Sequence, residues 1–264
     1  MGQHFLHDQG VLARIAYAAS GDRPTATIEI GAGRGALTRL LAANAPADGR
    51  VIAVELDDDL IPGLEALADE HPCVRRVHAD VLDIDLPSLL ASHGIVAPAR
   101  IVGNVPYNIT APIVAWLVSH VAQWDRAVLM TQKEVAQRMV TPPGARGCGA
   151  ISAFVHYHTT VRALFDVGSG AFTPQPRVKS AVIELTARAA PAVAVADEAL
   201  FFAITRQVFQ QRRKMLRGAL RALGTDAPAA VVSAGIDPTR RGETLTLDDF
   251  AAIANCLSSA RDET

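Results

Sequence analysis

The sequence predicts an α/β fold: a Rossmann-like, mostly parallel sheet with an antiparallel edge, followed by a small all-helical domain. Three observations support this prediction. Short β-branched runs alternate with helical stretches over the first two-thirds of the 264 residues. Polar residues stand at the ends of successive runs. After residue 197 only helical patterns remain. Alternation of this kind is typical of βαβ units with helices on both faces of the sheet.

Five apolar runs are predicted to be buried strands and four intervening segments to be helices, because their apolar residues recur at helical spacing. The strands are Thr27–Ile30, Arg50–Leu56, Val74–Ala79, Arg100–Gly103 and Ala127–Thr131. The helices are Ala36–Ala45, Leu60–Glu70, Pro87–His93 and Ala111–Val121.

Two further runs, Ser152–Thr160 and Ser180–Ala187, are predicted to be strands that pair antiparallel at one edge. The uncharged, low-complexity stretch Ala189–Ala196 then marks a boundary between an α/β domain, 1–190, and a small helical domain, 197–264. Helices are expected there at Glu198–Leu223, Pro228–Ala234 and Leu247–Ser258, separated by caps and Gly/Pro breaks.

The composition is that of a globular protein, with 50% hydrophobic and 20% charged residues. No apolar run reaches the roughly 18 residues that a membrane span needs. The first eight residues lack the features of a secretory signal. We therefore expect a cytoplasmic protein, and a monomer by default.

Cys73, Cys148 and Cys256 are scattered, and no pair has metal-ligand spacing. His156 and His158 lie two apart on a predicted strand, with no Cys or acidic residue nearby to complete a ligand set. They are expected to be ordinary strand histidines, and no metal is predicted.

The cluster Glu29-Ile-Gly31-Ala-Gly33-Arg-Gly35 follows the first predicted strand and opens a helix. Glycines there let the backbone approach a ligand, and the helix start offers free N–H groups. The spacing fits neither a phosphate-binding P-loop nor the dinucleotide fingerprint. Taken alone, the cluster is weak evidence for a nucleotide-like ligand.

Three further signals end the next three strands: Glu55, then Asp80-Val81, then Asn104. A carboxylate at Glu55 is placed to accept the hydroxyls of a ribose, and Asp80 to accept the exocyclic amine of an adenine. Since open α/β sheets bind ligands at the carboxyl ends of their strands, these groups are expected in one pocket. A ligand whose adenosine is held there, with a sulfonium methyl directed at Asn104, is S-adenosylmethionine.

The tetrapeptide Asn104-Val105-Pro106-Tyr107 is suited to holding a flat ring that carries an amine. The Asn104 amide oxygen and a backbone carbonyl of Val105-Pro106 are expected to accept hydrogen bonds from the N6 amine of adenine. Pro106 stiffens the turn, and Tyr107 offers a face for stacking a base. Phe172 is expected to close the other face of the base, or else simply to pack.

The net charge of −2 hides an uneven distribution. Residues 1–100 carry 8 basic and 14 acidic residues, whereas 101–264 carry 17 and 13. The stretch from Arg206 to Arg221 has six bases and no acid, which predicts contacts with RNA phosphates. These bases are Arg206, Arg212, Arg213, Lys214, Arg217 and Arg221, and Arg240-Arg241 are expected to extend the patch.

Taken together, the motifs resemble those of the ribosomal RNA adenine N6-dimethyltransferases, and most closely the small-subunit branch associated with kasugamycin sensitivity. Eight segments cover almost the whole chain in order. They are Gly2-Gln-His-Phe-Leu6, Glu29-Ile-Gly-Ala-Gly33, Val54-Glu-Leu-Asp57, Asn104-Val-Pro-Tyr-Asn-Ile-Thr110, Gln132-Lys-Glu-Val135, Phe172-Thr-Pro-Gln-Pro-Arg-Val178, Phe209-Gln-Gln-Arg-Arg-Lys-Met-Leu-Arg217 and Glu243-Thr-Leu-Thr-Leu247.

The resemblance implies that His4 and Leu6 line the S-adenosylmethionine pocket, with Gly31, Glu55, Asp80 and Asn104 as its other contacts. It also implies two methyls on each of two adjacent adenosines in the 3′-terminal hairpin of small-subunit (16S) rRNA, in a pre-ribosomal 30S particle. The family often has Asn at position 4 and Pro at position 32, where this chain has His4 and Ala32. It also often has a short basic extension before Gly2, so an RNA contact from such an arm is not expected here.

Three alternative functions compete with this interpretation. A macrolide-resistance dimethylase of large-subunit rRNA shares the catalytic motifs, but the segments around Arg212 and Glu243 favour the small-subunit branch. A ribosome-assembly or transcription factor on the same fold is disfavoured by the intact Glu55, Asp80 and Asn104, which do not exclude an added assembly role. An NAD-dependent oxidoreductase does not fit the glycine spacing.

Overall fold

The computed structural model describes residues 4–22, 24–224 and 226–262 of the chain. By their contacts the residues form two compact units. Unit 1 comprises 1–136 and 161–187, and unit 2 comprises 137–160 and 188–264. The predicted domain limits at 190 and 197 stay predictions. In the described part, no helix is long and apolar enough to cross a bilayer.

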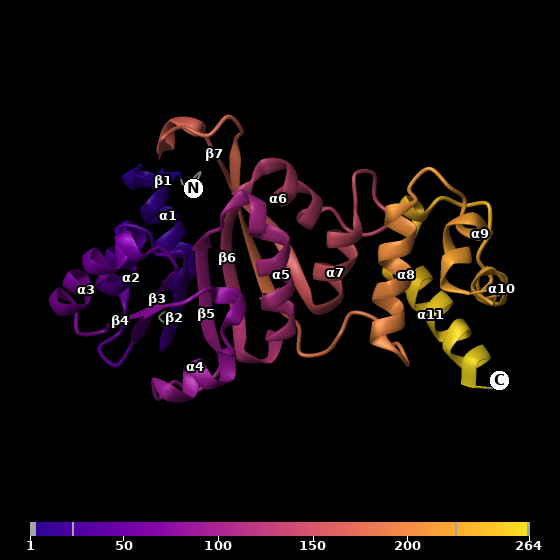
Figure 1. Cartoon of the computed structure of the whole chain (residues 1–264), viewed down its shortest axis with the longest axis horizontal. Helices are drawn as coiled ribbons and strands as arrows, with labels where there is room; N and C mark the ends of the chain where they lie inside the picture. Colours follow the sequence, from indigo (N-terminus) through magenta and orange to yellow (C-terminus); the bar gives the residue numbers. More distant parts are fainter. Residues whose placement is uncertain (1–3, 23, 225, 263–264) are drawn as a thin grey trace. The chain divides into compact units, whose positions relative to one another are not determined.

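Unit 1 is built on a seven-stranded sheet in the order β4-β3-β2-β5-β6-β9-β7 (Figure 1). Its strands are β2 Ala26–Ile30, β3 Arg50–Glu55, β4 Val74–His78, β5 Ala99–Asn104, β6 Trp124–Gln132, β7 Thr159–Val167 and β9 Ser180–Ala187. Strands β2 to β6 pair in parallel, and β9 pairs antiparallel with β6. The predicted mostly parallel sheet with an antiparallel edge is confirmed.

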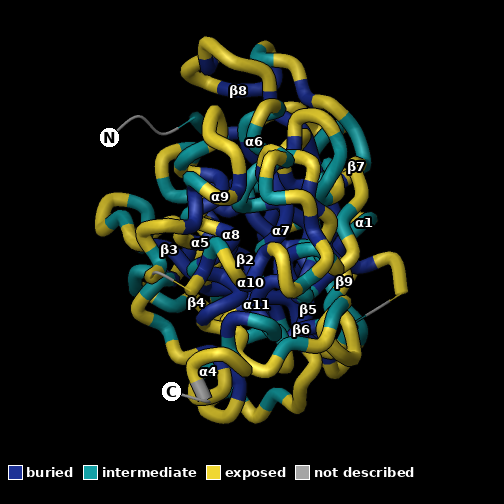
Figure 2. The backbone as a smooth tube through the Cα atoms, turned by 90° about the vertical axis from the view of Figure 1, so that its right-hand side faces the viewer, coloured by how far each residue is buried: buried dark blue, intermediate teal, exposed yellow. Residues whose placement is uncertain are grey.

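Three helices of unit 1 start at an aspartate cap, Asp8 or Asp85, or at the positive-φ Gly35. The helices of this unit are α1 Gln9–Ser20, α2 Ala36–Asn44, α3 Ile61–Glu70, α4 Leu86–Ser92 and α5 Thr110–Ser119, with α6 Lys133–Val140 at the junction with unit 2. The Asp8 carboxylate accepts from the Val11 N–H at 2.9 Å and caps α1. The central strands are almost fully buried, while the loops between elements are exposed (Figure 2).

A second, two-stranded sheet crosses unit 1 near its N-terminus. Strand β1, Phe5–Leu6, pairs antiparallel with β8, Phe172–Thr173. The register sets Phe5 opposite Thr173 and Leu6 opposite Phe172. The sequence predicted neither this pairing nor helix α1.

Unit 2 consists of helices around an aromatic core. Its elements are α7 Ala150–His158, α8 Glu198–Gln210, α9 Leu216–Ala219, α10 Ala227–Ser233 and α11 Leu247–Asp262. The 3₁₀ turns η6 Leu220–Leu223 and η7 Gly242–Thr244 connect them. Tyr157, Phe201, Phe202, Phe209 and Phe250 pack within the buried cluster.

Two predictions for unit 2 were wrong. Ser152–Thr160 is not a strand: most of it forms α7, so His156 and His158 lie on a helix. Glu198–Leu223 is not one helix, because the chain breaks between Gln211 and Met215, where Met215 makes an isolated bridge with Arg241. Both departures come from contacts with distant segments, which a local pattern does not contain.

Candidate active site

A cavity of about 920 Å³ opens at the carboxyl ends of β2, β3, β4 and β5. All four polar signals that the sequence placed at strand ends line it. The predicted site residues that line the cavity are His4, Leu6, Gly31, Gly33, Glu55, Asp80, Val81, Asn104, Pro106 and Tyr107. The parallel register brings them together, because each strand ends at the same edge of the sheet.

The glycine turn forms one wall of the cavity. Gly31 and Gly33 have φ values of 69° and 60°, in the left-handed region that favours glycine. The Gly31 N–H donates to the Val54 carbonyl at 2.9 Å, which ties the turn to β3. Substitution of either glycine by a residue with a side chain would strain this turn.

Glu55 braces the same turn from the end of β3. Its Oε2 accepts from the Gly33 N–H at 2.7 Å, while Oε1 accepts from the N–H groups of Leu56 and Asp57 at 2.9 and 3.0 Å. The side chain is 7% exposed. Since a carboxylate offers about four acceptor positions, three backbone donors leave room for one further donor. One acceptor position of Glu55 is thus free for a ribose hydroxyl, and acceptance of both hydroxyls stays a prediction.

Asp80 and its neighbour Val81 follow β4. One Asp80 oxygen, Oδ1, accepts from the Leu82 N–H at 2.9 Å and so begins the 3₁₀ turn η2 Val81–Asp83. No hydrogen bond to Oδ2 occurs within the described residues, so this oxygen is available to a ligand amine. Leu56, which is 60% exposed, and Val81 add apolar surface to the cavity.

Asn104 has an orientation that suits acceptance from an amine. Its Nδ2 donates to the His4 carbonyl at 3.3 Å, and Oδ1 accepts no hydrogen bond from the residues that the structure describes. The Pro106 carbonyl already accepts from the Ile109 N–H at 3.1 Å and from Thr110 Oγ1 at 3.3 Å. Val105 donates its N–H to Met130, but its carbonyl accepts no hydrogen bond from the described residues. Within the described residues, the unengaged backbone acceptor of the turn is thus Val105 rather than Pro106.

Tyr107 lies in the 3₁₀ turn η3, Tyr107–Ile109, directly after Asn104-Val-Pro. Its hydroxyl hydrogen-bonds Ser180 Oγ at 2.7 Å, and its ring lies 6.1 Å from the His4 ring at an angle of 30°. His4 is held in turn by a 2.7 Å hydrogen bond between Nδ1 and the Pro174 carbonyl. Gly2 and Gln3, which begin the N-terminal motif, lie outside the described residues.

Phe172 is placed differently from the expectation that it stacks on a base. It is 1% exposed, pairs with Leu6 across the two-stranded sheet, and belongs to the hydrophobic core of unit 1. It is not among the residues that line the cavity. In this structure Phe172 packs, and its neighbour Thr173 reaches the cavity instead.

Glu29 belongs to the glycine motif of the sequence, but it was not predicted to line the pocket. Glu29 lines the cavity at its base, is 3% exposed, and accepts from Thr38 Oγ1 at 2.6 Å. Burial raises the pKa of its carboxyl to about 8; the Thr38 hydrogen bond lowers that pKa, and the nearby Glu55 raises it. The signal that could have found it is its position two residues before Gly31, on the strand that leads into the glycine turn.

The predicted RNA-contact residues all lie on unit 2, and all six are exposed. They are divided among α8 (Arg206), the break between α8 and α9 (Arg212, Arg213, Lys214), α9 (Arg217) and η6 (Arg221). The bridge between Met215 and Arg241 brings a second basic segment beside the break. Arg240 is already engaged by Asp249 at 2.9 Å.

The cavity suits the sulfonium cofactor that the motifs predicted. It combines a glycine turn for close backbone approach, apolar surface for a purine, and the acidic Glu55, Asp57 and Asp80 for a positively charged ligand.

Comparisons with known proteins agree with this site. Residues 1–259 match the family model described as ribosomal RNA adenine dimethylase. The chain is 40% identical over 264 residues to ribosomal RNA small subunit methyltransferase A of Moorella thermoacetica, covering 97% of this chain and 91% of that protein. It is 43% identical over 261 residues to the protein of the same name from Afipia carboxidovorans, covering 97% and 90%.

Solved structures show the same fold. The 23S rRNA methyltransferase ErmE matches with a TM-score of 0.71 at 25% identity, over 96% of this chain and 99% of that one. A dimethyladenosine transferase from Plasmodium falciparum matches with a TM-score of 0.76 at 22% identity, over 98% of both chains. The chain belongs to the ribosomal RNA adenine dimethylase family.

Proposed function

We propose that this protein transfers methyl groups from S-adenosylmethionine to the N6 amines of two adjacent adenosines in the 3′-terminal hairpin of small-subunit (16S) rRNA. The observation that carries the proposal is that Asn104 Oδ1 and the Val105 carbonyl, on adjacent residues that line the cavity, both lack a hydrogen-bond partner among the described residues. Two acceptors on adjacent residues match an amine with two hydrogens. The two small-subunit relatives cited above support 16S rRNA over large-subunit rRNA.

The residues of the Asn104-Val-Pro-Tyr107 turn contribute by positioning the adenine. When bound, S-adenosylmethionine supplies a methyl group activated by its sulfonium. Asn104 and Val105 accept the N6 hydrogens, which favours the pyramidal amine whose lone pair is directed at that methyl. No strong general base is required, because the methylated ammonium is itself acidic. Tyr107 stacks on a base flipped out of its hairpin.

A second methylation presents an amine with only one hydrogen. One of the two acceptors is then enough, and the site must admit the first methyl group. Pro106 is exposed beside Tyr107 and leaves that side of the turn open.

Among the described residues, the exposed bases at the break between α8 and α9 are suited to bind RNA phosphates. The substrate we propose is 16S rRNA within a pre-ribosomal 30S particle, and we propose a monomer that acts in the cytoplasm.

The test is incubation of the protein with under-methylated small subunits and methyl-labelled cofactor, followed by nucleoside analysis of the rRNA. Label in dimethyladenosine of 16S rRNA, mapped by primer extension to two adjacent positions of the terminal hairpin, supports the proposal. Label only in 23S rRNA, or none, contradicts it.

A further inference from the structure

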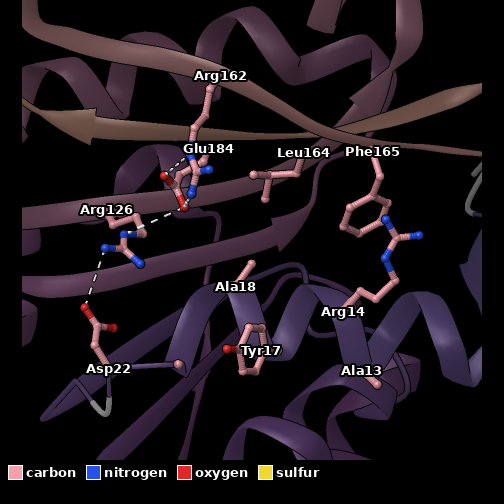
Figure 3. Close-up of a pocket in the computed structure, with 11 residues that line it drawn as sticks. Ala13, Arg14, Tyr17, Ala18, Asp22, Arg126, Arg162, Leu164, Phe165 and Glu184 are labelled. Carbon is pink, nitrogen blue, oxygen red and sulfur yellow. Dashed lines mark hydrogen bonds and ion pairs between the residues drawn. The ribbon is translucent and has the colours of Figure 1, made fainter.

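A second cavity lies in unit 1, outside the cofactor site. It is a groove of about 680 Å³ between helix α1 and the strands β6, β9 and β7 (Figure 3). Its α1 side presents Ala13, Arg14, Tyr17 and Ala18, and its strand side presents Leu164 and Phe165. Leu12 and Ile15 line the cofactor cavity instead. Helix α1 therefore separates the two cavities.

The groove exposes aromatic surface. Tyr17 is 77% exposed, and its ring makes no aromatic contact with another described residue. Figure 3 shows Arg14 reaching from α1 to the Phe165 ring, with its guanidinium carbon 3.6 Å from the ring centroid.

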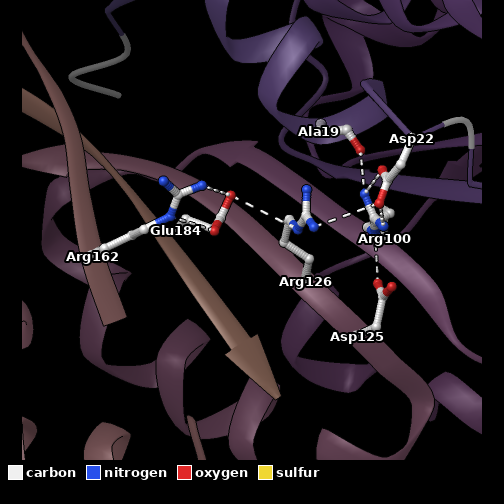
Figure 4. A network of polar contacts seen from close by, with 7 residues as sticks. All are labelled: Ala19, Asp22, Arg100, Asp125, Arg126, Arg162 and Glu184. Carbon is white, nitrogen blue, oxygen red and sulfur yellow. Dashed lines mark hydrogen bonds and ion pairs between the residues drawn. The ribbon is translucent and has the colours of Figure 1, made fainter. Parts of the chain in front are cut away.

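The two carboxylates of the groove, Asp22 and Glu184, are both paired with arginines (Figure 4). Asp22 is engaged by Arg100, which donates to both of its oxygens at 2.6 and 2.7 Å. Glu184 is engaged by Arg162 at 2.7 and 3.1 Å. Both carboxylates are thus neutralised by neighbouring guanidiniums.

Cationic donors remain. Within the described residues Arg14 has no acidic partner, and Arg162 uses only Nε and Nη2 on Glu184. The buried Nε of Arg126 makes no hydrogen bond, since Glu184 Oε2 is 3.8 Å away, within ion-pair range only. Arg14 and the unused nitrogen of Arg162 therefore offer positive charge beside the exposed Tyr17 ring.

We propose that this groove binds an unpaired segment of the RNA substrate, with a base stacked on Tyr17 and phosphates held by Arg14 and Arg162. The proposal rests on the proposed function for the identity of the RNA. Aromatic rings beside guanidiniums are the combination that holds single-stranded nucleic acid without regard to sequence. The open rim, where the Arg162 side chain is 67% exposed, admits a continuing strand rather than enclosing a small molecule.

The experiment measures binding of protein-free 16S rRNA and of under-methylated small subunits to the full-length protein and its variants. Tyr17→Ala should weaken binding of both about tenfold, while Tyr17→Phe keeps the ring and stays within about twofold of wild type. Arg14→Gln should weaken binding and reduce the slope of log affinity against log salt by about 0.7, whereas Arg14→Lys retains the slope. Affinity for S-adenosylmethionine should not change in any of these.

Val96→Ala and Arg39→Gln are the matched controls, since Val96 is 83% exposed and Arg39 lies on α2, neither at the groove. RNA that contains 4-thiouridine should cross-link to the peptide that carries Tyr17. Unchanged binding in Tyr17→Ala and Arg14→Gln overturns the proposal. So does a loss seen with particles but not with protein-free rRNA, which would indicate a ribosomal protein as the partner.

Methylation by the wild-type protein is assayed in parallel. If the wild type methylates while the groove variants bind rRNA normally, only the groove assignment fails. If the wild type binds rRNA through the groove but does not methylate, the proposed function fails and the groove assignment stands.

Discussion

The side-chain amide of Asn104 donates to the backbone carbonyl of His4 at 3.3 Å. One end of the amide is thereby tied to the N-terminal segment, and the other end faces the cavity. Because the donor is committed, the orientation of the acceptor is fixed before any substrate arrives. The N-terminal segment, itself anchored by β1 and β8, thus orients the group that we propose acts on the adenine amine.

Asn104→Ala should reduce turnover at least about 100-fold, as expected for removal of a positioned hydrogen-bond acceptor. Affinity for the cofactor should change by less than about threefold, because the glycine turn and Glu55 are untouched. Single-turnover methylation and calorimetric titration with the cofactor measure the two quantities. Asn44→Ala, at the end of α2, is the control asparagine. Full turnover in Asn104→Ala would contradict the assigned role.

Two substitutions at Tyr107 distinguish the role of its ring from the role of its hydroxyl. Tyr107→Phe loses the hydrogen bond to Ser180 and should cost about 1 kcal/mol of unfolding free energy while retaining most of the activity. Tyr107→Ala removes the stacking face and should weaken substrate use about tenfold or more, with cofactor binding retained. Steady-state kinetics with small subunits and urea unfolding distinguish the two. Equal activities in Phe and Ala variants would indicate that the ring only packs.

Much of this site was predictable because it depends on local patterns. Parallel strands that end together place Gly31, Glu55, Asp80 and Asn104 at one edge whatever the details of packing. The orientation of each side chain was not predictable. The bond from Asn104 to His4 spans 100 residues of chain, and the burial of Phe172 follows from a two-residue strand too short to leave a pattern.

The wrong predictions share a cause. The segment Ser152–Thr160 is rich in β-formers, yet it forms most of a helix, α7, whose Ser152 accepts from the Gly149 N–H and donates to the Arg138 carbonyl. The break after Gln211 is stabilised by the Met215–Arg241 bridge and by the Leu216 N–H bonded to the Arg240 carbonyl at 3.0 Å. Helix α1 was missed although Asp8 supplied a cap, because the N-terminal segment was interpreted only as a motif.

The buried carboxyl of Glu29 should make the stability of unit 1 depend on pH. Its pKa is raised from 4.5 to about 8, so between these values the unfolded chain releases a proton that the native state keeps. Stability therefore falls as pH rises through this window and levels off above about pH 8. In Glu29→Gln that loss is absent, and its stability relative to wild type should rise by up to about 1.4 kcal/mol per pH unit.

Urea unfolding of both proteins at intervals between about pH 5 and about pH 8 tests this expectation. Thr38→Val is a companion variant. It removes the donor that lowers the pKa of Glu29, so the decline in stability should extend to higher pH. A difference between wild type and Glu29→Gln that stays constant across the range would show that the carboxyl does not titrate in this way.

The basic residues at the break between α8 and α9 should contribute to RNA affinity through phosphate contacts. Arg213→Gln should weaken rRNA binding and lower the magnitude of the log–log salt slope by about 0.7 to 0.9, the value for one phosphate contact. Arg39→Gln, an exposed arginine paired with Glu70, is the control. Filter binding over a range of salt concentrations measures the slope, and a slope identical to wild type would exclude Arg213 as a phosphate contact.

Gly242, at the start of η7, allows this turn to approach helix α8 closely. A Cβ atom on this residue would lie 1.8 Å from Val208 Cγ1 of α8, and the position is buried. Gly242→Ala should therefore destabilise unit 2 by about 1 to 3 kcal/mol through overpacking, while cofactor affinity in unit 1 is retained. Gly63→Ala is the control: no atom lies within 4 Å of the added Cβ, and alanine favours helix α3. Val208→Ala in the Gly242→Ala background removes the clashing methyl and should restore part of the loss. If Gly242→Ala leaves the unfolding of unit 2 unchanged, the close packing of η7 on α8 is not what stabilises this unit.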